Sequence, residues 1–98
     1  MKHEMLCGAA RTVTDGLKDA QMQYEWAEKA RDHGDHEMAQ KHISEAHKRL
    51  SGIADWMALL EETEDAKTPL CRVLLDHYKH WHRDLTERVE HFHATGKA

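Results

Sequence analysis

A stretch dense in metal-ligand side chains lies in the C-terminal third of the chain, where residues 76–84 read DHYKHWHRD. On a helix, His77, His80 and Asp84 follow one another at steps of three and four residues, so their side chains share one face. Imidazole nitrogens and carboxylate oxygens bind zinc and iron, and a pair on one helix usually completes its shell from a facing helix. Glu28, on an earlier segment, is a candidate facing ligand. The spacing therefore suits a zinc or iron site within the chain, or one shared across a dimer.

The same residues also have a simpler interpretation. Histidine and acidic side chains often cover the edge of an apolar helix face and pair with neighbours four residues away, as His80 and Asp84 are placed to do. Polar flanks accompany almost every amphipathic helix, whereas a metal site requires several ligands to converge. The sequence therefore favours a polar helix flank over a metal site.

The composition predicts one helical domain. A chain of 98 residues can bury a single core, and it contains only one proline and five glycines among many good helix formers. Gly34 and Asp35 resemble a helix C-terminal glycine followed by a new N-cap, while Thr68 and Pro69 resemble a second N-cap with proline at the first helical position. The predicted helices cover residues 3–33, 35–64 and 69–94.

Each predicted helix carries an apolar stripe with steps of three and four residues, which is typical of bundle packing. Because the joints between the helices are short, we expect an all-α, up-down-up antiparallel bundle. Gly16 is a position at which the first helix could kink or break. The stripes are Leu6, Ala10, Val13, Leu17, Ala20, Tyr24 and Ala27, then Ala39, Ile43, Ala46, Leu50, Ile53, Met57 and Leu60, then Leu70, Leu74, Tyr78, Trp81, Leu85, Val89 and Phe92.

Four large apolar residues lie off these stripes, namely Met22, Trp26, Trp56 and Leu59. A monomer would expose them to water. Single exposed apolar residues are common, but two tryptophans with a methionine and a leucine favour a homo-oligomer that buries them. We expect a dimer, which would form a larger helical bundle.

Charge and hydropathy exclude several classes of function. The net charge is -4 with both signs interspersed, so no basic stripe is available for nucleic acid. Residues 5–10 are too short and too polar-flanked for a signal peptide or a membrane span, which predicts a cytoplasmic protein. In that reducing compartment Cys7 and Cys71 are expected to be free thiols. The chain also has no glycine-rich phosphate loop and no Gly-x-Ser-x-Gly, so catalysis without a metal is not expected.

Residues 24–50, YEWAEKARDHGDHEMAQKHISEAHKRL, resemble the helix-turn-helix of ferritin-like proteins of the rubrerythrin type. The resemblance implies two metal ions, held by a glutamate on the first helix and an E-x-x-H on the second. Glu25 or Glu28 matches the first position. At the second, Glu45 is followed three residues later by Lys48, and the chain has a reversed pair of His42 and Glu45.

Residues 46–52, AHKRLSG, resemble the phosphate-accepting helix of histidine phosphotransfer domains, which implies phosphorylation of His47. Three hypotheses therefore follow from the sequence. The first is a non-enzymatic protein that self-associates through the four off-stripe residues. The alternatives are a ferritin-like protein that binds zinc or iron, and a histidine phosphotransfer module.

Overall fold

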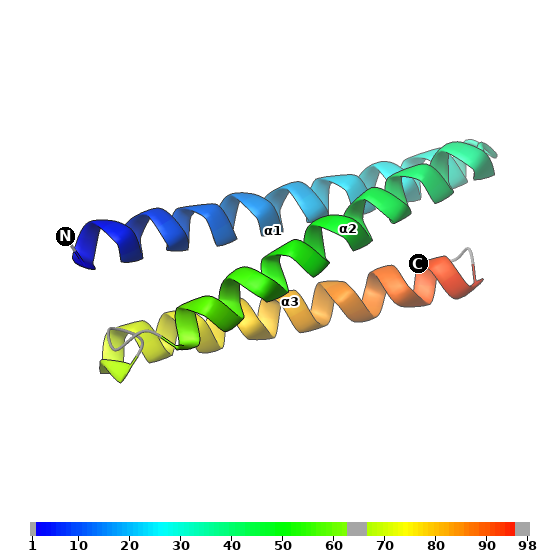
Figure 1. The fold of residues 1–98 in the computed structure, drawn as a ribbon. Coiled ribbons are helices and arrows are strands. Elements are labelled where there is room, and N and C mark those ends of the chain that lie inside the picture. The colour runs from blue at the N-terminus through cyan, green and yellow to red at the C-terminus, as the bar shows by residue number, and fades with distance from the viewer. Residues whose placement is uncertain (1, 63–66, 96–98) are drawn as a thin grey trace.

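The described part of the chain forms three helices and has the predicted all-α architecture (Figure 1). The computed structural model describes the backbone of residues 2–62 and 67–95, and the side chains of those residues from residue 10 onward. The helices run in alternating directions along a bundle of 49 × 19 × 16 Å, and the described ranges contain no strand. They are α1 (Lys2–Asp32), α2 (His36–Glu61) and α3 (Pro69–Thr95).

The turn between α1 and α2 has the predicted form. Gly34 adopts a left-handed conformation with φ of 80°, and its N-H donates to the carbonyl of Arg31 while that of Asp35 donates to Ala30. This hydrogen-bond pattern is a Schellman motif, which satisfies the last carbonyls of α1. The Asp35 carboxylate then accepts from the Met38 N-H at 3.1 Å and caps α2. Gly34 and Asp35 therefore end one helix and begin the next within two residues.

At the second joint, α3 begins at Pro69 as predicted, and the Thr68 carbonyl accepts the first hydrogen bond of the helix from Arg72 at 3.0 Å. Proline costs nothing at this position because the first helical N-H has no partner within the helix. The last helical residue of α2 is Glu61, and the predicted end at residue 64 lies outside the described residues.

The core follows the predicted stripes of α1 and α2 closely. All seven stripe residues of α2 are buried, as are the five of α1 from Val13 to Ala27. Ala10 is half-buried, and the side chain of Leu6 lies outside the described residues. Because alanine recurs on both stripes, the axes of α1 and α2 can approach closely, which makes this hairpin the main packing unit of the bundle.

The predicted stripe of α3 is wrong in its first two turns. Leu70 and Leu74 are exposed there, whereas Cys71 and Leu75 are buried. The reason is that α3 packs mainly against α2, so the buried face at this end is the one beside Lys79, which forms an ion pair with Glu61 of α2. From Leu85 onward the predicted and observed stripes coincide. Tyr78 and Trp81 are partly buried against the core.

Cys71 is buried and forms no disulfide with any residue that the structure describes. The side chain of Cys7 lies outside the described residues.

Gly16 does not break α1, which is continuous from Lys2 to Asp32. It allows α2 to approach, because a Cβ atom built at Gly16 would lie 2.9 Å from both Cγ1 and Cδ1 of the buried Ile53. Gly52, in the middle of α2, has nothing within 4 Å of such an atom. The two helical glycines therefore differ in their surroundings although they have the same intrinsic helix propensity.

We expect Gly16→Ala to lower the free energy of unfolding by about 1 kcal/mol, because overpacking at Ile53 outweighs the roughly 1 kcal/mol gained in helix propensity. The matched variant Gly52→Ala should raise the free energy of unfolding by about 0.5 to 1 kcal/mol, because alanine has the higher helix propensity and its methyl group contacts no neighbouring atom. Urea denaturation at one protein concentration measures both. Stabilisation by Gly16→Ala equal to that by Gly52→Ala would contradict the close approach at Gly16.

Candidate interaction surface

The α1-α2 hairpin has an outer face on the side away from α3. Glu61 and Leu50 of α2 mark the side toward α3, since Glu61 pairs with Lys79 and the Leu50 carbonyl lies 2.7 Å from His82 Nε2. Arg49 of α2 lies on the side toward α1, where it pairs with Asp19. We use the term outer hairpin face for the surface formed by Asp19, Met22, Trp26, Met38, Arg49, Trp56 and Leu59.

One end of the outer hairpin face is built around Trp26. Its ring lies edge-on to His42 of α2, with 5.4 Å between ring centroids. His42 is held in turn by Gln23, because Nδ1 of the imidazole lies 2.7 Å from Oε1 of the buried Gln23 amide. Met22 precedes Trp26 by one turn of α1, and Met38 precedes His42 by one turn of α2. Trp26 is thus held by its neighbours while 42% of it remains exposed.

The centre of the outer hairpin face is an ion pair between the two helices. Nη1 of Arg49 lies 2.6 Å from Oδ2 of Asp19, and both side chains are partly exposed. An ion pair so open to solvent contributes little to monomer stability, typically about 0 to 1 kcal/mol. More informative than this contribution to stability is its position, midway between Trp26 on α1 and Trp56 on α2.

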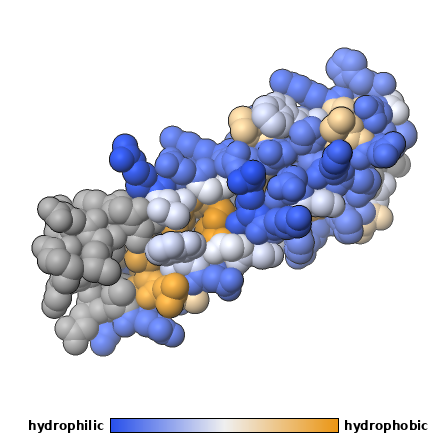
Figure 2. Space-filling view, turned by 45° about the horizontal axis from the view of Figure 1, so that its top comes forward, coloured by the Kyte–Doolittle hydropathy of each residue, from blue (hydrophilic) through white to orange (hydrophobic). Residues whose placement is uncertain are grey.

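The other end of the outer hairpin face carries Trp56 and Leu59, with 46% and 60% of their surfaces exposed. The space at Gly52, one turn before Trp56, is open. Figure 2 shows apolar surface gathered at this end of the bundle, where α2 ends and α3 begins, while the rest of the visible face is mostly hydrophilic. The exposed large hydrophobic residues of this end are Trp56, Leu59, Leu70, Val73 and Leu74.

All four residues predicted to lie at an interface are exposed, and the structure adds Met38, which is 42% exposed. A helical wheel could have identified Met38, because it precedes Trp56 by eighteen residues, or five complete turns, and so lies on the same side of α2. Leu70 and Leu74 were missed because their spacing fits the core stripe of α3.

The structure brings together two of the four predicted metal ligands. Nε2 of His80 lies 3.3 Å from Oδ2 of Asp84, and Arg83 contacts both side chains. The His77 ring packs beside Tyr78 instead. The pairing of His80 with Asp84 is the one expected for a polar helix flank.

Glu28 lies several helical turns from His80 along the bundle. Its carboxylate is close enough to Tyr24 to act on the pKa of the phenol, and the Tyr24 ring packs edge-on against Phe92 at 6.0 Å. Phe92 is twelve residues beyond His80 on α3, which corresponds to about 18 Å. Among the residues that the structure describes, no three His, Cys, Asp or Glu side chains are grouped as metal ligands. The zinc or iron site therefore remains a sequence prediction that these contacts do not support.

The residues implied by the two family resemblances lie apart from one another. Glu25 is exposed and accepts a 3.5 Å hydrogen bond from Gln21, while His42 is bonded to Gln23. His47 is exposed on α2, as a phosphate-accepting histidine would be, but exposure alone is common to most surface histidines. Both resemblances remain predictions.

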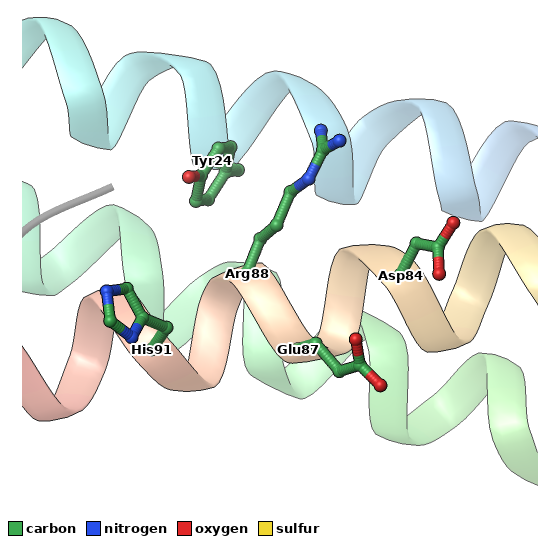
Figure 3. Close-up of a pocket in the computed structure, with 5 residues that line it drawn as sticks. All are labelled: Tyr24, Asp84, Glu87, Arg88 and His91. Atoms are coloured by element: carbon green, nitrogen blue, oxygen red, sulfur yellow. The ribbon is translucent and has the colours of Figure 1, made fainter.

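A groove of about 370 Å³ lies between α1 and α3 and is lined by Tyr24, Asp84, Glu87, Arg88 and His91 (Figure 3). Burial and the nearby Glu28 raise the pKa of Tyr24, while Arg88 and Arg31 oppose that shift. The Arg88 side chain extends toward α1 beside Tyr24, whereas the Glu87 carboxylate points away from α1. Charges of both signs line the groove without converging, so it has no evident catalytic arrangement.

The described helices include none that is long and apolar enough to cross a membrane. Comparisons with protein-family models, curated proteins and solved structures find no match to this chain.

Proposed function

We propose that this protein is a self-associating structural protein, in which two copies pack through the outer hairpin face to form a larger helical bundle. The observation that carries the proposal is the exposure of Trp26 and Trp56 on one face of the same hairpin. Tryptophan is enriched at the energetic centres of protein interfaces because a large ring loses much water-exposed area on contact. A partner surface would bury both rings.

The extent of the exposed surface supports the same proposal. The chain exposes 6671 Å², whereas a folded monomer of 11.4 kDa exposes about 5,800 Å² on average. The difference of about 900 Å² reflects the elongated shape and is close to the roughly 800 Å² that each partner buries in a standard interface. Pairing along the long axis would remove an area of that order.

The experiment is sedimentation equilibrium at protein concentrations of about 1 to 100 µM, a range that detects dimers of moderate affinity. We expect a mass near twice 11.4 kDa for the native chain and a monomer mass for the double variant Trp26→Lys, Trp56→Lys. The matched control is Leu70→Lys, Leu74→Lys, which places the same charges on exposed apolar positions of α3. It should remain dimeric.

Far-UV circular dichroism of each variant confirms that the helices are retained. A native chain that is monomeric at the highest concentration would contradict the proposal. So would a dimer that survives the tryptophan substitutions and is lost in the α3 variant, because the interface would then lie on α3.

A further inference from the structure

The outer hairpin face has an internal symmetry centred on its ion pair. Trp26 lies seven residues after Asp19 on α1, and Trp56 lies seven residues after Arg49 on α2. Seven residues are close to two turns, so each tryptophan lies on the same side of its helix as the charged residue and about 10 Å along it. Because α1 and α2 are antiparallel, the two tryptophans lie in opposite directions from the ion pair.

Two copies of this face can pack against each other with two-fold symmetry in two ways. If the axis runs across the helices, α1 lies over α1 of the partner. Asp19 then faces the partner's Asp19, and Arg49 faces the partner's Arg49. If the axis runs parallel to the helices, α1 lies over α2 of the partner, and each Asp19 faces the partner's Arg49. Both arrangements are closed and use the same patch on each subunit.

We propose that the two copies pair about an axis parallel to the helices, so that Asp19 and Arg49 of both subunits form a four-membered ring of alternating charge at the centre of the interface. This inference rests on the proposed self-association. In this arrangement the Trp26 ends of the two subunits meet, and the Trp56 ends meet at the other side of the ring. Each Trp26 then lies over the segment of the partner's α2 that carries Met38 and His42.

The charges decide between the two arrangements because contact removes water from them. In the monomer the Asp19-Arg49 ion pair is partly solvated and contributes little to the free energy of folding. In the dimer, stacking like charges at the centre would add repulsion to the cost of dehydration. The alternating ring gives each carboxylate two guanidinium neighbours and each guanidinium two carboxylates. Packing against a surface without this alternating pattern of charges would leave Asp19 and Arg49 without opposite charges across the interface, which disfavours other partners.

The test is subunit mixing between the native chain and the charge-exchanged variant Asp19→Arg, Arg49→Glu. Each protein keeps an ion pair within the hairpin and an alternating ring in its own homodimer, so each should form dimers. In a mixed dimer, however, every contact between subunits in the ring joins like charges. After equal amounts of isotope-labelled native chain and unlabelled variant reach equilibrium, native mass spectrometry reports the share of mixed dimer.

We expect the mixed dimer to fall from the statistical share of one half to below about one tenth, because like charges at a dehydrated contact are strongly disfavoured. The matched control exchanges the Glu61-Lys79 pair, which joins α2 to α3 away from the outer hairpin face. This variant, Glu61→Lys, Lys79→Glu, should mix with the native chain at one half.

The other outcomes overturn the inference in distinguishable ways. A mixed share above one half would indicate the axis across the helices, because Asp19 and Arg49 would then each meet an opposite charge. A share of one half would place the ion pair outside the contact. A charge-exchanged variant that is monomeric would contradict the ring, and a monomeric native chain would contradict the proposed self-association itself.

Discussion

Replacing Phe92 with alanine is expected to lower the free energy of unfolding by about 3 to 5 kcal/mol, which is a large share of the stability of a small domain. Phe92 is 1% exposed and is among the largest fully buried side chains of the core. Its ring contacts the edge of Tyr24, and the Arg31 guanidinium lies 5.3 Å from the ring centroid. Alanine would remove the apolar contact between α3 and the C-terminal half of α1 and leave a cavity. Urea denaturation measures the loss.

The variant Phe92→Leu separates the ring interactions from the volume. Leucine refills most of the cavity but lacks the aromatic contacts with Tyr24 and Arg31. We expect it to cost about 1 to 2 kcal/mol, since aromatic and cation-π contacts contribute about 0.5 to 1.5 kcal/mol each. A loss below about 1 kcal/mol for Phe92→Ala would show that α3 does not depend on this contact.

Replacing Leu75 with alanine is expected to cost about 2 to 4 kcal/mol, whereas the same change at Leu74 should cost less than about 1 kcal/mol. The two residues are adjacent and identical, but Leu75 is 8% exposed and Leu74 is 37% exposed. Leu75 packs into the core on the side of α3 that faces α2, so its truncation removes buried apolar contacts. Truncation of Leu74 removes surface that is already partly in contact with water.

Thermal unfolding of the two leucine variants, followed by circular dichroism under identical conditions, compares them directly. The pair serves as its own control because the chemical change and the helix propensity are the same. A larger loss for Leu74→Ala than for Leu75→Ala would mean that the stripe predicted from the sequence, rather than the rotated one, faces the core.

That difference in α3 shows where sequence patterns stop being informative. In α2 an apolar side chain recurs at every step of three or four residues, and no second stripe competes with this one. The buried face of α2 was therefore predictable from the sequence. The start of α3 offers two adjacent candidates, because Leu70 and Leu74 fit one stripe while Cys71 and Leu75 fit another. The choice depends on how closely α3 approaches α2 rather than α1, which is a property of the assembled bundle and not of the α3 sequence.

The candidate interface was partly predictable for a related reason. Trp26 and Trp56 lie off the core stripes, so their exposure followed from the period of the helix alone. The Asp19-Arg49 contact did not follow, because a pair between helices depends on their relative rotation and translation. The same requirement explains why the histidine-rich stretch was ambiguous. Spacing placed His80 beside Asp84, but only the tertiary structure could show that Glu28 lies several turns away.

The hydrogen bond between Gln23 and His42 also determines how α1 and α2 align along their length. The alanines that line the seam between these helices are nearly interchangeable, so a slip by one turn would still place small side chains against small side chains. After such a slip the Gln23 amide would remain buried without its imidazole partner, at a cost of about 1 to 3 kcal/mol. Together with the close approach of Ile53 to Gly16, this polar contact therefore favours the observed alignment of the hairpin, and with it the position of Trp26 relative to Trp56.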